Sequence, residues 1–287
     1  MPEGMIRIAI QSKGRLNEDS MQLLRDAGVR VNNDKRKFLG QADGYPLEVL
    51  YLRDDDIPEV VADGAADIGI VGLNEVEETQ AGLDVVRHLG FGHCRLSLAV
   101  PKSEDYHDVS WFEGKCIATS YPQILRRYLD DHQIHASLRV INGSVEIAPS
   151  AGIADAIFDI VSSGGTLVSN GLREVVQVMQ SEAVLVVRRD LPAVKRAQLD
   201  QLLFRFDAVS DSRGKKYILM NLPSDRVEDA LAILPSMRSP TVMPLADLNW
   251  CSLHSVVSES ELWQHVEQLK QIGAEGILVL TLDKVIA

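Results

Sequence analysis

The segment from Gly152 to Leu167, with the sequence GIADAIFDIVSSGGTL, carries residues suited to binding a phosphate group. An apolar strand expected over 155–161 runs into a turn of glycines and hydroxyl-bearing residues. Glycines let the backbone approach a ligand closely, and the N-terminus of a helix expected over 167–179 would point free N–H groups at an anion. The sequence therefore predicts a phosphate site made of five consecutive residues: Ser162, Ser163, Gly164, Gly165 and Thr166.

Two carboxylates precede this turn. Asp155 and Asp159 are four residues apart, so in a strand their side chains point to the same face. Carboxylates in this place could hydrogen-bond ribose hydroxyls or hold a water on Mg²⁺. The alternative is an exposed turn whose glycines serve geometry only, and the two carboxylates favour the phosphate site over it.

Two other turns after expected strands carry polar side chains. Lys13 and Arg15 flank a glycine after the strand expected over 7–11, which would let both cations reach a polyphosphate. A second turn contains Tyr121 within the letters TSYP, and it offers hydroxyl groups and an aromatic face. Each has an alternative, a solvated basic turn in the first case and a structural Tyr-Pro turn in the second.

A third turn, RDDDIP, begins at Arg53. Its three consecutive acids could bind Mg²⁺, but capping of the following helix by Asp56 explains that residue equally well. The seven histidines form no cluster with metal-ligand spacing, and the Walker, G-x-S-x-G and G-x-G-x-x-G motifs are absent from the sequence. Metal binding at this turn is therefore the weaker interpretation.

Alternating strand and helix signals must position these turns. Because open α/β sheets bind ligands at the carboxyl ends of their strands, we expect the turns to meet at one edge. The stretches 60–72 and 147–164 have the same order of helix, Ala-Asp, strand and glycine turn. This likeness indicates two similar lobes that face a cleft, although short α/β units can also resemble each other by chance.

The last part of the chain changes character. Strands expected over 216–221, 241–245, 251–257 and 276–282 alternate with helices over 224–234 and 258–273. The order β-α-β-β-α-β is that of the ferredoxin-like unit, and 210–214 is a plausible linker before it. The sequence therefore predicts an α/β protein with a third, smaller domain.

Bulk composition excludes several classes of function. A net charge of −12 argues against a nucleic-acid partner or an anionic membrane surface, both of which favour a basic face. Three widely spaced cysteines argue for reduced thiols, and neither a signal-peptide pattern nor a stretch of about 20 apolar residues occurs. We therefore expect a cytoplasmic protein of two or three domains.

Several motifs together resemble one known family. The segments KGRL (13–16), DDIP (55–58), DGAADIGIVG (63–72), ATSYP (118–122), GSVEIAP (143–149) and 152–167 are similar in order and spacing to ATP phosphoribosyltransferase. The segments SPTVMPL (239–245), WCSLH (250–254) and IGAEGILV (272–279) resemble the regulatory domain of its long form. The resemblance covers essentially the whole chain, and 152–167 is its most diagnostic part.

The resemblance implies a fold and a reaction. The fold is a two-lobed core like that of type II periplasmic binding proteins, followed by a ferredoxin-like regulatory domain. The implied boundaries are 1–94 with 184–209 for lobe I, 95–183 for lobe II and 210–287 for the regulatory domain. The implied reaction transfers the phosphoribosyl group of phosphoribosyl pyrophosphate to N1 of ATP, with loss of pyrophosphate, as the first step of histidine biosynthesis.

The resemblance also assigns residues. It implies that residues 162–166 bind the 5′-phosphate of phosphoribosyl pyrophosphate. It also implies that Glu146, Asp155 and Asp159 contact the ribose and Mg²⁺, with Mg²⁺ itself held by Asp155 and Asp159. ATP and pyrophosphate are implied to contact Lys13, Arg15 and Tyr121. The family's regulatory domain binds L-histidine as an inhibitor, and the residues available to meet it here are Asn221, Ser239, Thr241 and the backbone at Ala274. The alternative is that these are turn residues that hold a dimerisation domain together. The family forms dimers and hexamers, so a homo-oligomer is expected.

Two other functions share parts of this pattern. A two-lobed solute-binding protein would have the same core, but it normally has a signal peptide and lacks both the phosphate loop and a third domain. A phosphoribosyltransferase acting on another base would leave the C-terminal domain unexplained. Because one fold hosts many functions, the decision depends on the site residues.

Overall fold

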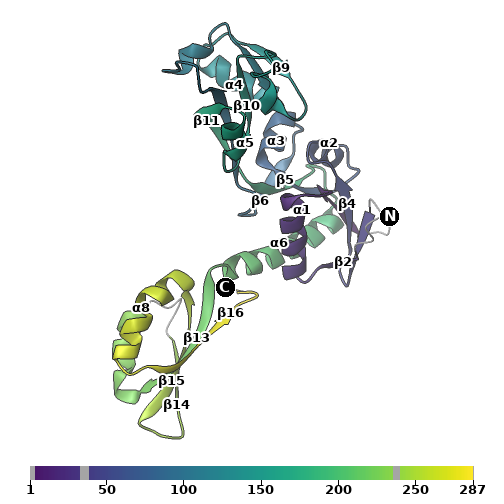
Figure 1. Ribbon diagram of the computed structural model, residues 1–287. Coiled ribbons are helices and arrows are strands. Elements are labelled where there is room, and N and C mark those ends of the chain that lie inside the picture. The colour runs from purple at the N-terminus through teal and green to yellow at the C-terminus, as the bar shows by residue number, and fades with distance from the viewer. Residues whose placement is uncertain (1–3, 33–38, 235–239, 287) are drawn as a thin grey trace. The chain divides into compact units, whose positions relative to one another are not determined.

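The structure is a computed structural model that describes residues 4–32, 39–234 and 240–286. It contains two compact units, the first formed by residues 1–25 and 29–200 and the second by 26–28 and 201–287. Each unit is described here by itself. The first unit contains two lobes, each with its own sheet (Figure 1).

Lobe I is built on a sheet that, within the described residues, has the order β2-β3-β4-β1-β5-β12-β6. Strand β1 runs parallel to β4 and β5, whereas β12 runs antiparallel to β5 and β6. The strands are β1 (Ile6–Gln11), β2 (Arg30–Asn32), β3 (Leu39–Asp43), β4 (Leu47–Leu52), β5 (Ile68–Gly72), β6 (Asp84–His88) and β12 (Ala183–Val187). The helices are α1 (Arg15–Asp26), α2 (Ile57–Ala62) and α3 (Leu73–Thr79).

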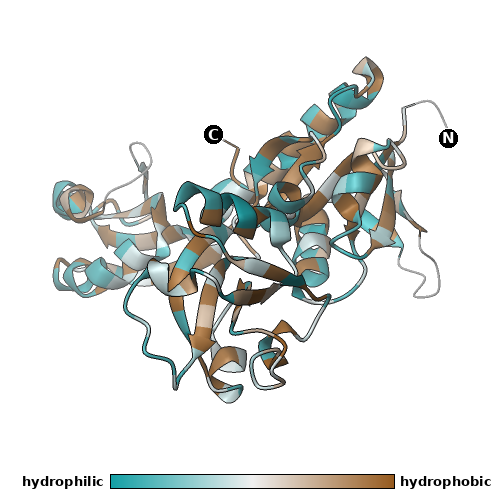
Figure 2. Ribbon diagram, turned by 90° about the horizontal axis from the view of Figure 1, so that it is seen from above, coloured by the Kyte–Doolittle hydropathy of each residue, from teal (hydrophilic) through white to brown (hydrophobic). Residues whose placement is uncertain are grey.

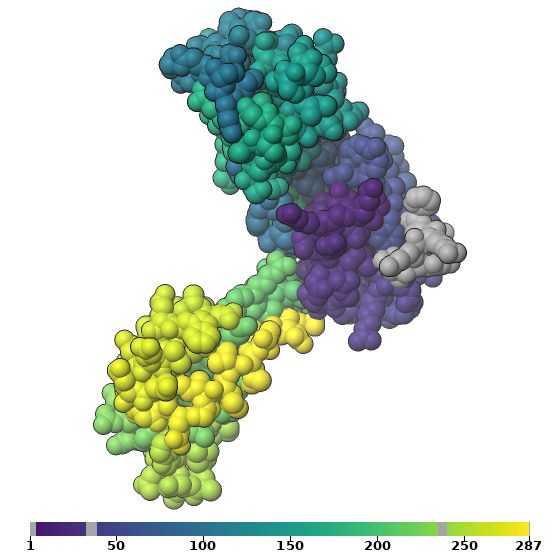
Figure 3. All heavy atoms as spheres, viewed as in Figure 1, coloured from purple at the N-terminus to yellow at the C-terminus, as the bar shows by residue number. Residues whose placement is uncertain are grey.

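Lobe II has the sheet order β11-β7-β10-β8-β9 within the described residues. Its strands are β7 (Cys94–Pro101), β8 (Cys116–Thr119), β9 (Ser137–Val140), β10 (Ala156–Val161) and β11 (Leu172–Ser181). Its helices are α4 (Pro122–Asp131), α5 (Gly165–Ser169) and the short 3-10 turns η1 (Val109–Phe112) and η2 (Val145–Ile147). The space-filling view shows the purple surface of lobe I beside the teal surface of lobe II (Figure 3).

The two lobes share a core arrangement. The order β4-β1-β5-β12-β6 in lobe I corresponds to β9-β8-β10-β7-β11 in lobe II, with the same parallel and antiparallel neighbours. Strand β5, near the middle of the lobe I sheet, is a continuous apolar run that is buried along most of its length. Figure 2 shows hydrophobic colour on the strands inside the molecule. The repeat expected from residues 60–72 and 147–164 therefore marks two similar lobes, as predicted.

The second unit has the sheet order β14-β15-β13-β16, in which each strand is antiparallel to its neighbour. Helices α7 and α8 contribute to the hydrophobic core on one face of this sheet. The prediction of a ferredoxin-like unit is confirmed. Its elements are β13 (Lys215–Pro223), the 3-10 turn η3 (Ser224–Arg226), α7 (Val227–Ile233), β14 (Thr241–Pro244), β15 (Trp250–Ser258), α8 (Glu259–Gln271) and β16 (Glu275–Thr281), after the linking helix α6 (Ala193–Ser212).

Two local features test the sequence reading. The capping box at the start of α8 is confirmed, since Ser258 Oγ accepts the Glu261 N–H at 3.2 Å. The helix expected over 167–179 is wrong, because α5 ends at Ser169 and β11 begins at Leu172. Gly171 has a φ of 70°, which breaks the helix, and the valines after it suit a strand paired with β7. None of the described helices is long and apolar enough to cross a membrane.

Candidate active site

The predicted phosphate loop follows β10 directly. Gly164 has a φ of 78°, a left-handed conformation that favours glycine, and α5 begins at the next residue. The loop is exposed apart from a half-buried Gly164, so its amides and hydroxyls are available to a ligand. Arg95 anchors the start of the loop by donating to the Ser162 carbonyl at 3.0 Å, while its guanidinium is paired with Glu174.

Asp159 lies on β10, two residues before the end of the strand, and is half-buried. Burial raises the pKa of Asp159 to about 6, against the effect of a hydrogen bond from the Ile160 N–H, and the charge of Glu146 raises it further. The two carboxylates therefore act on each other beside the phosphate loop. Glu146 is in η2, which packs near β10. This is where a ribose or a hydrated cation would find oxygen ligands.

Asp155 is at the opposite end of β10 from the phosphate loop. Its carboxylate accepts the Cys116 N–H at 2.8 Å, and its own N–H donates to the Cys116 carbonyl at 2.8 Å. The corresponding residue of lobe I, Asp67, makes the same pair of bonds with Arg7, both at 2.9 Å. Asp155 thus ties the start of β10 to β8, as Asp67 ties β5 to β1.

The position of Asp155 contradicts the expectation that Asp155 and Asp159 hold one Mg²⁺ ion together. Their α-carbons are about 13 Å apart along an extended chain, at roughly 3.3 Å per residue. A single Mg²⁺ needs its oxygen ligands at about 2.1 Å, so one ion cannot be held by both carboxylates. Among the described residues, no group of three or more His, Cys, Asp and Glu side chains is placed to hold a metal ion.

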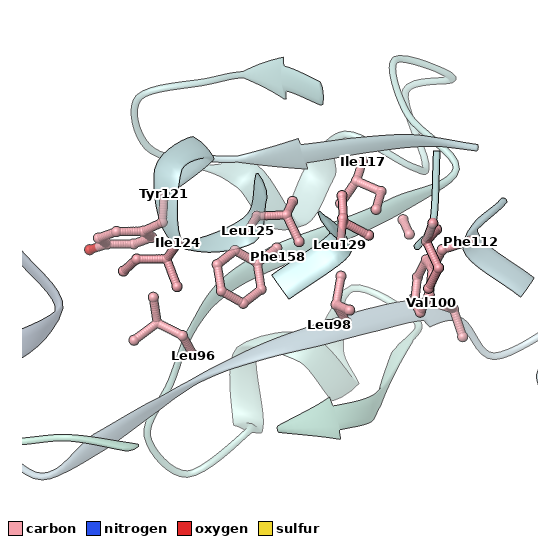
Figure 4. Close-up of a cluster of buried hydrophobic side chains, with 12 residues drawn as sticks. Leu96, Leu98, Val100, Phe112, Ile117, Tyr121, Ile124, Leu125, Leu129 and Phe158 are labelled. Carbon is pink, nitrogen blue, oxygen red and sulfur yellow. The ribbon is translucent and has the colours of Figure 1, made fainter. Parts of the chain in front are cut away.

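Tyr121 lies at one end of the hydrophobic cluster of lobe II, with its hydroxyl oxygen pointing out of the cluster (Figure 4). The side chain is 8% exposed. The hydroxyl donates to Glu75 Oε1 of lobe I at 2.8 Å and accepts from Asn74 Nδ2 at 3.3 Å. Burial, followed by the neighbouring Glu75 charge, raises the pKa of Tyr121 well above its usual range, so the phenol stays protonated.

Glu75, Asn74 and Ser181 complete a buried polar network that the sequence reading missed. Ser181 Oγ donates to Asn74 Oδ1 at 2.7 Å and accepts the Asn74 N–H at 3.1 Å. Burial raises the pKa of Glu75 to about 7. The available signal was the position of Asn74 and Glu75 directly after β5, which matches the position of the phosphate loop after β10 in lobe II.

Lys13 lies in the turn between β1 and α1, where Gly14 has a φ of 94°, and Arg15 is the first residue of α1. Both are exposed, and neither forms an ion pair with any residue that the structure describes. They are at the carboxyl end of β1, as expected for residues that meet a ligand at this edge of the sheet. Both cations are therefore available to an anion.

The acidic turn after β4 behaves differently from its prediction. Arg53 forms a bidentate pair with Asp55, at 2.9 and 2.8 Å. Asp56 makes no side-chain capping bond with α2, so capping does not explain this residue. The charge of Asp54 contributes to the raised pKa values of both Glu75 and Tyr121, because this turn lies near the buried polar network.

A cavity of about 610 Å³ extends along the strands that connect the lobes. Ser162 of the phosphate loop and Leu73 at the start of α3 line it. Further along, Glu182 accepts from the Gly90 N–H at 3.0 Å and lies 2.9 Å from His88 Nδ1. The cavity is large enough for a nucleotide-sized ligand, and both polar and apolar groups line it.

The raised pKa of Glu75 predicts a pH dependence of stability. The folded protein binds this proton more tightly than the unfolded chain, so the stabilisation is fully present below the unfolded pKa of about 4.5 and is lost as the pH rises through about 7. Between pH 4.5 and pH 8 the free energy of unfolding should fall by up to roughly 3 kcal/mol relative to a Glu75→Gln variant.

Urea unfolding of both proteins at several pH values measures this difference. The variant keeps an acceptor oxygen for Tyr121 but cannot ionise, and Asp159 titrates in both proteins, so its contribution cancels. Parallel pH profiles for wild type and variant would contradict a buried, proton-binding Glu75.

The residues expected to bind histidine are in the second unit. A Cβ built on Gly276 would lie 3.6 Å from Asn221 Nδ2, so the Asn221 side chain reaches the start of β16, close to the buried Ala274. Thr241 is exposed on β14 and pairs with His254. His254 and the Ser252 that pairs with Asn221 are two residues apart, so Asn221 and Thr241 share one sheet face. Ser239 lies outside the described residues.

Comparison with known proteins identifies relatives along the whole chain. Residues 53–208 match the family described as ATP phosphoribosyltransferase, and residues 212–284 match the family described as HisG, C-terminal domain. Proteins named ATP phosphoribosyltransferase from Parabacteroides distasonis and Bacteroides fragilis are each 54% identical over 282 residues, covering 98% of this chain and 100% of the relative.

Solved structures also resemble a large part of this chain. The ATP phosphoribosyl transferase (HisG:HisZ) complex from Thermotoga maritima contains a chain with a TM-score of 0.61 and 30% identity, and the match covers 70% of this chain and 98% of that one. A histidine kinase sensor domain with similarity to periplasmic binding proteins has a TM-score of 0.50 at 10% identity, covering 72% of this chain and 91% of its own. That second likeness concerns the fold alone.

Proposed function

The chain belongs to the ATP phosphoribosyltransferase family, in its form with the C-terminal domain, and we propose that the candidate active site carries out the family's reaction. The enzyme transfers the phosphoribosyl group of phosphoribosyl pyrophosphate to N1 of ATP and releases pyrophosphate, the first step of histidine biosynthesis. Family membership decides against a solute-binding protein and against a transferase for another base. The expected limits, 1–94 with 184–209, 95–183 and 210–287, remain our proposal for the domains.

The phosphate loop is proposed to hold the 5′-phosphate of phosphoribosyl pyrophosphate. The observation that carries this assignment is the exposed turn from Ser162 to Thr166, with Gly164 in a left-handed conformation before α5. Such a turn presents several backbone N–H groups to one anion, and the hydroxyls add further donors. Arg95 holds the first carbonyl of the loop in place, so the amides are arranged before the ligand arrives.

Asp159 and Glu146 are proposed to contact the ribose. In the transition state, positive charge develops on the ribose ring while negative charge develops on the leaving pyrophosphate. A carboxylate beside the ring stabilises the first charge. The raised pKa of Asp159, about 6, still leaves most of this group ionised at neutral pH. The protein therefore needs no nucleophile of its own, and positioning with electrostatic stabilisation is sufficient.

Lys13 and Arg15 are proposed to neutralise ATP and pyrophosphate, because both are exposed cations at the carboxyl end of β1. Tyr121 is proposed to border the ATP site. Its hydroxyl is engaged with Glu75, so it contributes the edge of its ring and a fixed loop rather than a free hydroxyl. The turn after β1 in lobe I and the turn after β8 in lobe II occupy corresponding places, and both are proposed to contact the substrates.

Mg²⁺ is proposed to accompany the pyrophosphate group. Asp159 and Glu146 offer the hard oxygen ligands that this ion prefers, and two carboxylates with substrate phosphates are a common arrangement for it. When bound, the ion would offset the charge that develops on pyrophosphate. Asp155 is not included in this proposal because its carboxylate is engaged at the other end of β10.

Phosphorus NMR tests the assignment of the phosphate loop. Phosphoribosyl pyrophosphate is titrated with the protein in the presence of Mg²⁺ and in the absence of ATP. The 5′-phosphate resonance should shift or broaden on binding, since its oxygens exchange water for backbone amides. A 5′-phosphate resonance that stays unchanged while the pyrophosphate resonances move would contradict the assignment.

Control by L-histidine is proposed for the second unit, whose described residues contain no phosphate-type loop and place several polar side chains on the open face of the sheet. Tyr217 Oη lies 2.8 Å from His254 Nδ1, and Ser252 Oγ lies 3.1 Å from His254 Nε2. Together with Asn221 and Thr241, these groups suit the charged ends of a small zwitterion. Dimers and hexamers, and a cytoplasmic location, belong to the same proposal.

L-Histidine is therefore expected to bind the intact protein and to inhibit it, although it resembles neither substrate. Allosteric coupling energies are typically about 1–3 kcal/mol, so histidine should weaken substrate binding by roughly 5- to 150-fold. Asn221→Ala should weaken histidine binding and leave the uninhibited rate unchanged. Calorimetry with L-histidine, and rates with and without it, measure both effects. No binding to the intact protein at millimolar histidine would contradict the proposal.

A further inference from the structure

Helix α3 of lobe I contacts lobe II through several of its acidic residues. Glu75 accepts from Tyr121, as described above, and Glu77 Oε2 accepts from Arg127 Nη2 at 3.1 Å. Glu78 makes the most extensive contact, because its carboxylate accepts hydrogen bonds from the first turn of α4. Helix α3 thus connects the end of β5 in one lobe with the end of β8 in the other.

Glu78 supplies the N-terminal cap of α4 from the other lobe. One carboxylate oxygen accepts the Gln123 N–H at 2.9 Å, and the second accepts the N–H groups of Gln123 and Ile124 at 3.1 and 3.0 Å. Pro122 occupies the start of the helix and has no N–H, and the N-cap residue Tyr121 makes no side-chain capping bond. The first free amides of α4 are therefore satisfied by a residue 45 positions away.

The consequence reaches Tyr121 because this residue directly precedes the capped turn. Its backbone N–H is held by Thr119 Oγ1 at 2.8 Å, and its hydroxyl is held by Glu75. The peptide groups that follow are held by Glu78. Glu75 and Glu78 are one helical turn apart on α3, so a single rigid helix fixes the ring and the backbone of Tyr121 together.

We propose that Glu78 is a positioning residue for the transferase reaction, which acts by capping α4 across the lobe boundary and thereby fixing the Tyr121 loop. The proposal rests on the role assigned to Tyr121 at the border of the ATP site. A cap within one lobe would stabilise α4 alone. A cap across lobes also fixes the distance between the two halves of the site, so its loss changes the alignment of substrates bound on either side.

The first test is physical and independent of turnover. Amide hydrogen exchange is measured on the peptide that contains Gln123 and Ile124, in wild type, Glu78→Ala and Glu77→Ala. Glu77→Ala is the matched control, because it removes an exposed interlobe pair from the same helix without touching the cap. Exchange should become faster in Glu78→Ala alone. Unchanged exchange in Glu78→Ala would overturn the proposal.

The second test concerns catalysis. Removing a charged hydrogen-bond acceptor that aligns the site should lower kcat roughly tenfold in Glu78→Ala, and Glu77→Ala should retain the wild-type kcat. Glu78→Gln keeps one acceptor oxygen and should recover part of the loss, and it serves in place of the alanine variant if that variant fails to fold. A wild-type kcat in a folded Glu78 variant with fast exchange at α4 would overturn the proposal.

A double-mutant cycle shows whether Glu78 acts through Tyr121. If both residues fix the same loop, Glu78→Ala combined with Tyr121→Phe should be roughly as slow as the slower single variant, whereas independent effects would multiply. Multiplying effects would overturn the proposed route through Tyr121. Full activity of Tyr121→Phe alone would instead contradict the fixing of the loop through the Tyr121 hydroxyl, and the exchange experiment still decides the cap.

Discussion

Gly165→Asp is expected to weaken the binding of phosphoribosyl pyrophosphate by roughly a hundredfold. A carboxylate at this position would lie where the 5′-phosphate binds, and losing one hydrogen bond to a charged group already costs about 1.5–3 kcal/mol. The substitution should not disturb the fold, since Gly165 is not in the left-handed region and an added Cβ would lie 3.6 Å from Ser163 Oγ, an ordinary contact. ATP binding should change far less.

Calorimetric titration with each substrate measures both affinities. Gly165→Ser is the matched control, because it adds a Cβ and a polar atom at the same place without a charge. It should bind phosphoribosyl pyrophosphate far better than the aspartate variant does. If Gly165→Asp turned over at the normal rate, the assignment of residues 162–166 to the 5′-phosphate would be wrong.

Lys13→Ala and Arg15→Ala are each expected to lower kcat/KM for ATP by tenfold or more. Each loses a cation that would pair with a polyphosphate, which is worth about 1.5–3 kcal/mol when the contact is charged. The melting temperature should hardly change, because both side chains are exposed and form no ion pair with the described part of the chain.

Steady-state kinetics and thermal unfolding on the same preparations separate the two effects. Lys102→Ala, which removes an exposed cation just beyond the far end of β7, should leave both quantities unchanged. A large fall in melting temperature with intact kinetics would show that Lys13 and Arg15 serve the fold and not the site.

Much of the architecture could be predicted from local signals. Apolar runs predicted strands such as β1 and β10, and the Ala-Asp repeat predicted the likeness of the two lobes. The structure adds the reason for that repeat, since Asp67 and Asp155 each bind the backbone of the neighbouring strand in the same way. The repeated aspartate is therefore a structural feature of the fold, and its place in the diagnostic segment 152–167 made it resemble a site residue.

The sequence reading failed where distant residues decide the outcome. The local sequence after Leu167 predicts a helix, but the pairing of β11 with β7 and the conformation of Gly171 make it a strand. Nothing in the local sequence distinguishes Glu75 and Glu78 from other surface acids. Their roles depend on α4, some 45 residues later in the chain, and no local pattern carries that information.

The phosphate loop could be predicted because its chemistry is local. Glycines, hydroxyls and the start of a helix occur within five consecutive residues, and the structure places them in one exposed turn. The carboxylates around it could be predicted only in part, since Asp159 and Glu146 approach each other in the fold while Asp155 does not join them. Asp155 and Asp159 share one face of the strand, but the distance between them along the strand keeps Asp155 away from the other two carboxylates.

A single reaction mixture tests the central claim most directly. The protein is mixed with Mg²⁺, ATP and phosphoribosyl pyrophosphate, and the products are separated and counted. We expect one new nucleotide, with the ribose joined to N1 of adenine, for each pyrophosphate released, and we expect Gly165→Asp to form neither at a comparable rate. Release of pyrophosphate while ATP stays unmodified, or no release by a folded protein, would contradict the account.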